Sequence, residues 1–246
     1  MSRLLLAGSL AAAAFAVFSA LPVQADRNHP ETLDEKGTPF GANWARTGRF
    51  DKLTATGMDD VRLVSGQEWR IRATGDARAV SQLRFLVDNE TLIIGRTSKP
   101  RERFGKTQIE VIAPTLRAVT SAGSGAVDVE RISGDRASAT VAGSGRTTIR
   151  RVDAERLTAT VAGSGGLDVA GRSQRADVTI AGSGRLVGDG FTAGSASVTV
   201  AGSGAARFRS TGPIRATILG SGSAEIVGTT DCAQTRMGSG RLICRR

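Results

Sequence analysis

The stretch Ala122-Gly123-Ser124-Gly125 contains the first of seven copies of Gly-Ser-Gly in this chain of 246 residues. The copies begin at Gly123, Gly143, Gly163, Gly182, Gly202, Gly220 and Gly238, so they are spaced almost evenly along the sequence. Their period of about 20 residues is too short for a pair of helices and fits one coil of a β-solenoid.

Apolar residues alternate along the sequence on both sides of each Gly-Ser-Gly. In the third repeat they stand at Ala159 and Val161 before the glycine and at Leu167 and Val169 after it. Because the side chains of a strand point alternately to its two faces, these residues are expected to point into a core. Each coil is then a strand, a Gly-Ser-Gly corner, a second strand and a corner of variable sequence. Glycine suits the repeated corner, because a positive φ or a close backbone approach leaves no room for a Cβ. The pattern predicts an all-β protein, with a right-handed, single-stranded parallel β-helix over residues 115–246.

The composition agrees with a thin core. The chain has 31 Gly, 8 Phe, 2 Trp and no Tyr, so the core must consist mainly of small aliphatic side chains. The formal net charge is +10 at pH 7, and it comes almost wholly from arginine. Two explanations of this excess stay open, a biased genome composition and a surface that binds anions.

Residues 1–25 have the pattern of a secretory signal peptide. Arg3 precedes an apolar run over residues 4–21, and Val23-Gln24-Ala25 resembles a cleavage site. We therefore expect an exported protein that is periplasmic, secreted or on the cell surface. There its basic surface would meet phosphorylated lipids and acidic glycans, and no nucleic acid. No second apolar run of about 18 residues follows, so no transmembrane segment is expected after removal of the signal.

The rest of the chain divides into three predicted regions. Residues 26–48 are polar, contain two prolines and lack periodicity, so we expect a flexible lead-in. Residues 49–114 form an N-terminal β region of short alternating segments. Within it, residues 53–57 and 61–63 look like a degenerate first coil of the solenoid. The other segments are expected to pair antiparallel beside the mouth of the solenoid, where they cover an open sheet edge.

Threonine stands three positions before the first glycine of every repeat. This threonine file comprises Thr120, Thr140, Thr160, Thr179, Thr199, Thr217 and Thr235. Regular files of outward threonines on a flat solenoid can order water, including ice. The other interpretation is that threonine suits an exposed strand and stacks on itself between coils. The outward position two residues before each threonine is mixed in sequence, which favours the second interpretation.

Several motifs are similar to those of a known family. Phe50 opens an F-x-x-L-x-x-x-G pattern, Leu92-Ile93-Ile94 belongs to a hairpin, and Ala113-Pro114-Thr115-Leu116 leads into the first Gly-Ser-Gly. Together with the repeated V-A-G-S-G corners, they resemble the head GIN domain family, also called autotransporter adhesins, from about residue 50 to residue 246. The resemblance implies a parallel β-helix exported to the periplasm or cell surface. It implies no catalytic residues, because the family supplies none to carry over.

Catalytic chemistry has little support in the repeats. Other β-helical proteins cleave acidic polysaccharides with clustered carboxylates, so a polysaccharide lyase or hydrolase is the alternative function. The outward carboxylates Asp128 and Asp168 would lie two coils apart, about 9.6 Å, which is loose for a shared metal. The repeats contain no histidine, since His29 in the lead-in is the only one. We therefore expect no catalytic residue, no metal and no cofactor.

The two cysteines, Cys232 and Cys244, are expected to form a disulfide within the last coil. They stand six positions before and six positions after Gly238, at inward positions that Ile214 and Ile226 occupy in the preceding coil. An inward pair can face across the coil, and export favours oxidation. The alternative, a metal or redox site, lacks partner ligands.

Arginines recur at the variable corner and form a predicted ridge. Its members are Arg136, Arg156 and Arg175, seven positions before the glycine in three consecutive coils, with Arg150, Arg151 and Arg172 in nearby corners. Coils stacked about 4.8 Å apart would place the guanidinium groups where they suit lipid phosphates or acidic glycans. Asp135 and Glu155 precede two of these arginines and could instead neutralise them as exposed ion pairs. The sequence thus predicts a non-enzymatic envelope protein for binding, adhesion or structure, and it leaves the oligomeric state open.

Overall fold

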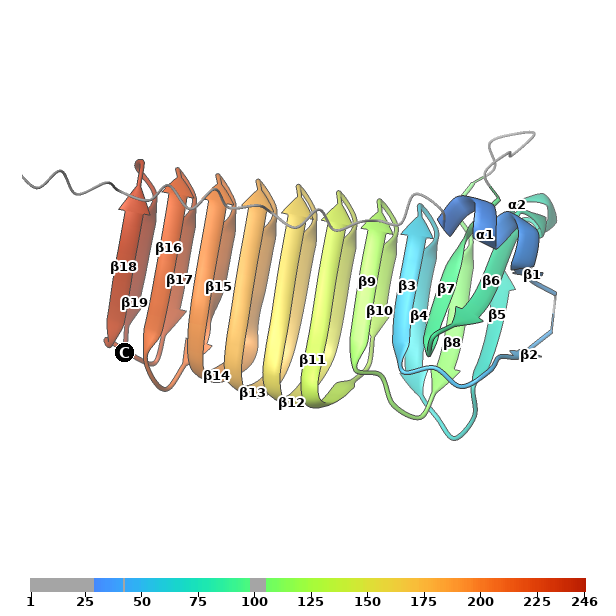
Figure 1. The fold of residues 1–246 in the computed structure, drawn as a ribbon, viewed down its shortest axis with the longest axis horizontal. Coiled ribbons are helices and arrows are strands. Elements are labelled where there is room, and N and C mark those ends of the chain that lie inside the picture. The colour runs from blue at the N-terminus through green and yellow to red at the C-terminus, as the bar shows by residue number, and fades with distance from the viewer. Residues whose placement is uncertain (1–28, 42, 98–104) are drawn as a thin grey trace, which may run out of the picture.

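The computed structural model describes residues 29–41, 43–97 and 105–246. The predicted signal peptide lies outside these residues. The structure is nearly all-β, with 69% strand and 4% helix. Its coils stack along the long axis of the molecule as a β-solenoid of about 6 turns (Figure 1). The predicted β-helix is confirmed, and its right hand stays a prediction.

The N-terminal part precedes the Gly-Ser-Gly repeats. Its elements are α1 (His29–Lys36), β1 (Thr38–Pro39), β2 (Ala45–Arg46), β3 (Lys52–Gly57), β4 (Asp60–Ser65), β5 (Arg70–Thr74), α2 (Ala77–Ser81), β6 (Leu83–Asp88), β7 (Thr91–Arg96) and β8 (Gln108–Ala113). No helix in the described ranges is long and apolar enough to cross a bilayer.

The repeats form the remaining strands. They are β9 (Ala118–Gly123), β10 (Ala126–Val129), β11 (Ile132–Gly143), β12 (Arg146–Gly163), β13 (Gly166–Gly182), β14 (Arg185–Gly202), β15 (Ala205–Ser210), β16 (Ile214–Gly220), β17 (Ser223–Val227), β18 (Cys232–Met237) and β19 (Arg241–Arg245). The strands β12 to β14 run through the variable corner, so each joins the second strand of one coil to the first strand of the next.

Successive coils pair in parallel with equivalent positions in register. The first glycines of the corners form one continuous file of Gly57, Gly123, Gly143, Gly163, Gly182, Gly202 and Gly220. Gly57 ends β3, and β4 pairs with β10 through Val61 and Val127. The degenerate first coil is therefore confirmed.

The geometry of the Gly-Ser-Gly corner explains why glycine recurs there. Gly163 has a φ of +110°, which glycine adopts without strain. A Cβ at this position would lie 2.6 Å from the carbonyl oxygen of Gly143. That oxygen accepts hydrogen bonds from the backbone N–H groups of Ser164, at 3.0 Å, and Gly165, at 2.9 Å. One carbonyl of the preceding coil thus satisfies two donors of the next corner, and the approach requires a residue without a Cβ.

The core is the stack of inward files that the sequence predicts. Residues such as Val161 and Leu167 are buried. In the later coils, Phe191 and Phe208 are the largest fully buried side chains, with 6.2 Å between their ring centroids. A single hydrophobic cluster extends from Phe40 to Ile226, so each coil is stabilised mainly by its two neighbours.

Spatial order differs from chain order at the N-terminal end. The strand β3 lies between β7 and β9, and β4 lies between β8 and β10, so the first coil is inserted between later segments. The strand β6 pairs antiparallel with β7, and β5 pairs antiparallel with β8, as predicted for the mouth of the solenoid. Against the prediction, β7 and β8 also pair parallel with β3 and β4. The short strands β1 and β2 pair antiparallel with β6 and β5, and both helices lie at the same end (Figure 1).

The lead-in contains structure that the sequence does not predict. Its described residues form α1, β1 and β2. Leu33 of α1 and Phe40 are buried, and Phe40 packs edge-on against Phe85 of β6 with 5.1 Å between ring centroids. Two isolated apolar residues give no periodic signal. Their burial depends on tertiary contact with the strands that close the end of the solenoid.

Cys232 and Cys244 form the predicted disulfide. They pair in register with Ile214 and Ile226 of the preceding coil, so they take the expected inward positions. The other inward positions of β18 are polar, namely Gln234 and Arg236, and Arg236 is exposed where the preceding coil has a buried isoleucine. The crosslink therefore joins β18 to β19 where apolar burial is smallest.

Removing the disulfide is expected to loosen the last coil selectively. The loop constraint lost in the Cys232→Ala/Cys244→Ala variant is worth about 3 kcal/mol in the chain-entropy model, or roughly 100-fold in an equilibrium constant. Hydrogen exchange should become faster by about that factor in β18 and β19. The amides of β12 and β13 serve as the internal control and should keep their protection. Unchanged exchange in the last coil would contradict the prediction.

Candidate functional site

The face formed by the second strands of the coils carries charges that pair with one another between coils. Arg150 donates to both carboxylate oxygens of Asp128, and Nη1 of Arg146 lies 2.7 Å from Oδ2 of Asp168. Arg207 lies 3.1 Å from Asp189. We call this the paired face. Its carboxylates are engaged by arginine, and the described residues contain no group of three or more side chains suited to hold a metal ion.

The opposite face carries the threonine file in register, as predicted. All of its members except the exposed Thr235 are half-buried. The adjacent outward file consists of alanine in five consecutive coils, Ala122, Ala142, Ala162, Ala181 and Ala201. These two files present hydroxyl and methyl groups without charge, and a second row of threonines is missing from them.

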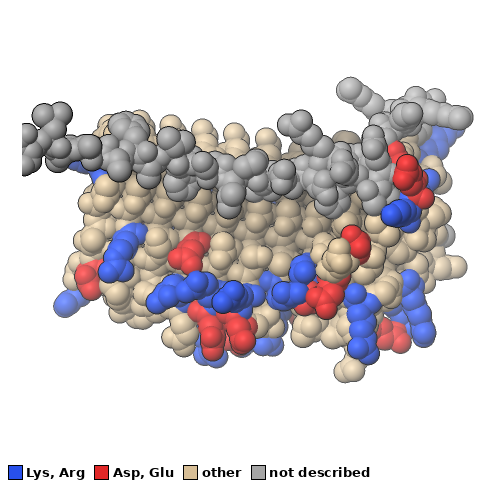
Figure 2. Space-filling model, in the orientation of Figure 1, with Lys and Arg blue, Asp and Glu red and all other residues tan. Residues whose placement is uncertain are grey.

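The variable corner brings three of the six predicted arginines together. Arg136, Arg156 and Arg175 pair in register on β11, β12 and β13, and all three are exposed. We call them the arginine file. The residues directly before them are Asp135, Glu155 and Gln174. We call these three the acidic file, although its third member, Gln174, is neutral. Figure 2 shows a row of basic side chains along the lower rim over the middle coils, with acidic side chains beneath it.

Both files line a shallow groove of about 480 Å³, together with Ser195. A second hollow of about 550 Å³ lies on the corner, and the acidic file lines it as well, with Asp153 and Arg172 among its other lining residues. The acidic file is therefore shared by two open hollows.

The expected neutralisation of the arginine file by Asp135 and Glu155 is not seen. Arg156 has Asp177 as its partner, at 3.8 Å. No carboxylate of the described residues lies within 4.0 Å of the charged nitrogens of Arg136 or Arg175. Adjacency in sequence therefore does not bring these carboxylates to the guanidinium nitrogens, and the partner of Arg156 stands on the next coil.

The other three arginines of the predicted ridge lie elsewhere. Arg150 belongs to the paired face, where it binds Asp128. Arg172 lies 3.3 Å from Asp153. Arg151 and Arg172 line a further hollow of about 310 Å³ at the same corner. Of the six arginines of the predicted ridge, Arg136, Arg156 and Arg175 thus form one file. The other three have different surroundings.

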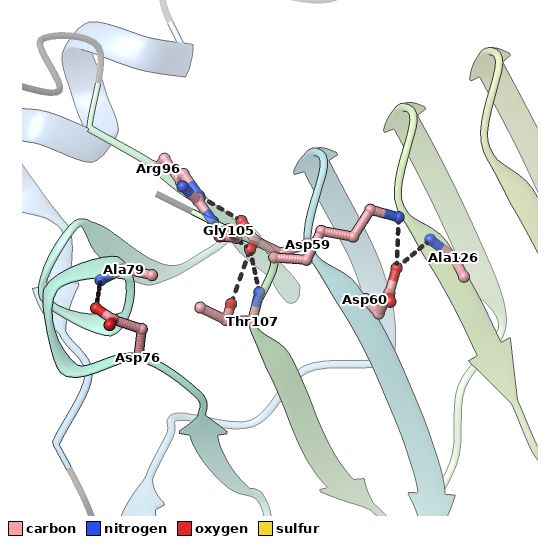
Figure 3. A network of polar contacts seen from close by, with 9 residues as sticks. Asp59, Asp60, Asp76, Ala79, Arg96, Gly105, Thr107 and Ala126 are labelled. Carbon is pink, nitrogen blue, oxygen red and sulfur yellow. Dashed lines mark hydrogen bonds and ion pairs between the residues drawn. The ribbon is translucent and has the colours of Figure 1, made fainter. Parts of the chain in front are cut away.

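A polar network that the sequence analysis does not single out lies at the first corner (Figure 3). Asp59 is buried and stands where the later corners have their second glycine. It accepts two hydrogen bonds from the Arg96 guanidinium, each of 2.7 Å, and two from the N–H and hydroxyl of Thr107, each of 2.8 Å. The network ties the end of β7 and the start of β8 to the first coil. The departure from Gly-Ser-Gly to Gly57-Met58-Asp59 is the signal in the sequence that could reveal it.

The charge state of Asp59 follows from these contacts. Burial raises the pKa of its carboxyl, because it disfavours the charged form. The hydrogen bonds from Arg96 and Thr107 outweigh burial and hold the pKa below its ordinary value. Asp59 therefore remains an ionised structural anchor.

Comparison with known proteins supports the fold. A family model described as "Putative auto-transporter adhesin, head GIN domain" matches residues 49–230. A solved "putative adhesin" from Bacteroides fragilis NCTC 9343 has a TM-score of 0.75 and 21% identity, and the match covers 83% of this chain and 95% of that one. A "putative lipid binding protein" from Parabacteroides distasonis ATCC 8503 has a TM-score of 0.68 and 22% identity, with 85% and 98% covered. A "putative adhesin" from Parabacteroides merdae ATCC 43184 has a TM-score of 0.67 and 18% identity, with 84% and 96% covered.

At these identities the solved structures show a shared fold. The comparison with curated proteins gives no match. The family model, however, spans most of the chain and includes both the inserted first coil and six of the seven Gly-Ser-Gly corners. The chain therefore belongs to the head GIN domain family.

Proposed function

We propose that the protein is an exported, non-enzymatic binding module of the cell envelope, and that its arginine file binds anionic groups of surface glycans or lipids. The observation that carries the proposal is a contrast between two sets of arginines. On the paired face, Arg146, Arg150 and Arg207 each reach a carboxylate. On the variable corner, Arg136 and Arg175 have no carboxylate of the described residues within 4.0 Å. Exposed guanidinium groups without such partners are available to anions such as carboxylate and phosphate, which the planar guanidinium fork can bind with two hydrogen bonds.

Two further observations support export and binding. A disulfide at the end of the solenoid is stable in an oxidising compartment such as the periplasm or cell surface. Among the similar structures, two are named as adhesins and one as a lipid-binding protein. A binding role on the same fold agrees with those names.

The alternative of a polysaccharide lyase or hydrolase has weaker support. Asp128 and Asp168, the outward carboxylates considered for catalysis, are each bound by an arginine. They are also separated by Thr148 in the register, so they lie two coils apart. A general acid or base needs a side chain that can exchange a proton near the operating pH, and the repeats contain no histidine.

The proposal is tested with two variants of equal charge. The Arg136→Gln/Arg156→Gln/Arg175→Gln variant removes the arginine file, and the Arg146→Gln/Arg150→Gln/Arg207→Gln variant removes three arginines of the paired face. Retention is measured on immobilised polygalacturonate and on phosphatidylglycerol vesicles, at low and high salt. Three exposed contacts of up to about 1 kcal/mol each predict a loss of roughly tenfold or more for the first variant only. Wild-type retention should weaken with salt, because exposed charges are screened over about 10 Å.

The two probes separate an acidic glycan from a lipid phosphate as the ligand. An equal loss in both variants would mean that net charge alone causes retention, and the arginine file would not be the site. Retention that neither variant nor salt changes would also remove the proposal.

A further inference from the structure

We infer that the groove between the arginine file and the acidic file selects a zwitterionic group, an anion joined to a protonated primary amine. Phosphoethanolamine is the simplest ligand of this class. The inference rests on the proposed function and narrows its ligand. It predicts that a purely anionic polymer is not the preferred partner of this corner.

Acidic and basic residues line the same groove. In two adjacent coils an acidic residue directly precedes an arginine, as Asp135-Arg136 and Glu155-Arg156, and all four side chains line the same groove. The two doublets are in register on paired strands, so the arrangement repeats after about 4.8 Å. In the third coil Gln174 precedes Arg175, so the doublet there has a neutral amide in place of the carboxylate.

Apart from Arg156, which has Asp177 at 3.8 Å, the charges that line the groove have no partner of opposite sign among the described residues. Within the described residues, neither Asp135 nor Glu155 has a basic nitrogen within 4.0 Å, and the same holds for Arg136 and Arg175 toward carboxylates. Elsewhere on the solenoid, opposite charges on neighbouring coils do pair, as Arg150 does with Asp128. The groove is therefore a place where acids and bases lie close together without satisfying each other.

This arrangement disfavours a ligand that carries only negative charge. An anion held by Arg136 or Arg156 would lie well within a Debye length of about 10 Å from the carboxylates of the acidic file. Its attraction to the arginines would be offset by repulsion from Asp135 and Glu155. A ligand that also carries an ammonium group turns this repulsion into attraction.

The hydrogen-bonding capacities match as well. An ionised carboxylate only accepts hydrogen bonds, and a primary ammonium group offers three donors. A guanidinium only donates, in a planar fork that fits phosphate. A ligand with a phosphate and an ammonium separated by a short linker would thus satisfy one doublet, and a surface that repeats this group could satisfy both.

The first experiment titrates soluble phosphoethanolamine and glycerol phosphate into the whole mature protein. Backbone amide shifts of residues 134–136 and 153–156 report on the groove by NMR. We expect phosphoethanolamine to bind about fivefold more tightly than glycerol phosphate, the factor for one exposed ion pair. The Asp135→Asn/Glu155→Gln variant should lose this preference, and the Asp128→Asn/Asp168→Asn variant of the paired face should keep it.

The second experiment identifies the source of the group. Retention is compared on phosphatidylcholine vesicles that contain equal mole fractions of phosphatidylethanolamine or phosphatidylglycerol. Preference for phosphatidylethanolamine supports a lipid headgroup. Selective binding of soluble phosphoethanolamine without vesicle retention supports the same group on a glycan.

The outcomes separate the inference from the function on which it rests. If glycerol phosphate binds as tightly as phosphoethanolamine, or if Asp135→Asn/Glu155→Gln strengthens retention on phosphatidylglycerol without any loss of selectivity, the groove is an anion site and the zwitterion inference is overturned. If removal of the arginine file changes neither titration nor retention, the proposed function fails with it.

Discussion

Replacing Gly163 by alanine is expected to lower the free energy of unfolding by about 2–5 kcal/mol. About 1–2 kcal/mol arises because an L-residue is forced into a left-handed conformation, since Gly163 has a φ of +110°. About 1–3 kcal/mol arises from overpacking, since the new Cβ would lie 2.6 Å from the Gly143 carbonyl oxygen. That oxygen cannot withdraw without weakening its bonds to Ser164 and Gly165. Urea unfolding followed by circular dichroism should show a lower midpoint.

Gly134→Ala is the matched control. Gly134 also has a positive φ, +129°, but no atom lies within 4 Å of its added Cβ. The Gly134→Ala variant should therefore lose only the part of the free energy of unfolding that comes from backbone conformation, about 1–2 kcal/mol. Equal losses at both positions would show that the close approach between coils is not what demands glycine at the corner.

Asp59→Asn is expected to lower the free energy of unfolding by about 3–5 kcal/mol, the usual effect of removing one partner of a buried ion pair. The reason is that the Arg96 guanidinium, whose side chain is only 14% exposed, loses both of its hydrogen bonds to the Asp59 carboxylate. The amide of asparagine also presents N–H donors where the carboxylate accepts from Thr107. The measurement is again the urea midpoint. Asp128→Asn, which breaks the exposed pair with Arg150, should leave the urea midpoint nearly unchanged.

Acid titration checks the cause of the Asp59 effect. The pKa of Asp59 is lower in the folded protein than its ordinary value. The contacts of the ionised carboxylate therefore contribute fully to the free energy of unfolding above the unfolded-state pKa. This contribution is lost as pH falls through the folded-state pKa. The stability difference between wild type and Asp59→Asn should shrink over that acidic range. A difference that stays constant from neutral pH to acid would show that the ionised carboxylate is not responsible.

The solenoid could be predicted because its signals are local and repeated. The regular recurrence of Gly-Ser-Gly defines the coil, and alternation around it defines the inward files. The same register places Cys232 and Cys244 opposite Ile214 and Ile226, so position alone predicts their pairing. Each of these inferences uses only the distance of a residue from the nearest Gly-Ser-Gly.

Features that depend on contacts between distant residues could not be predicted in this way. The Asp59 carboxylate meets Arg96 across 37 positions, where no repeat relates the two. In the candidate groove, adjacency in sequence suggests that Glu155 neutralises Arg156, yet Arg156 reaches Asp177 on the next coil. Adjacency in sequence does not by itself bring the charged atoms of two side chains together, whereas stacking places residues of neighbouring coils side by side. The open charges of the groove are a consequence of this geometry, which composition does not reveal.

The insertion of β3 and β4 between later strands imposes an order on folding. From β11 onward each coil closes on the segment one repeat away, as Gly143 does on Gly163. In contrast, Gly57 of β3 must meet Gly123 of β9, with β5 to β8 lying between them in the chain. Closing the longer loop costs more chain entropy and is slower. In a chain that emerges N-terminus first, β3 and β4 therefore gain their second neighbour only after residues 118–129 have emerged. Until then these strands present an open edge to other chains, and afterwards the repeats can extend the stack one coil at a time.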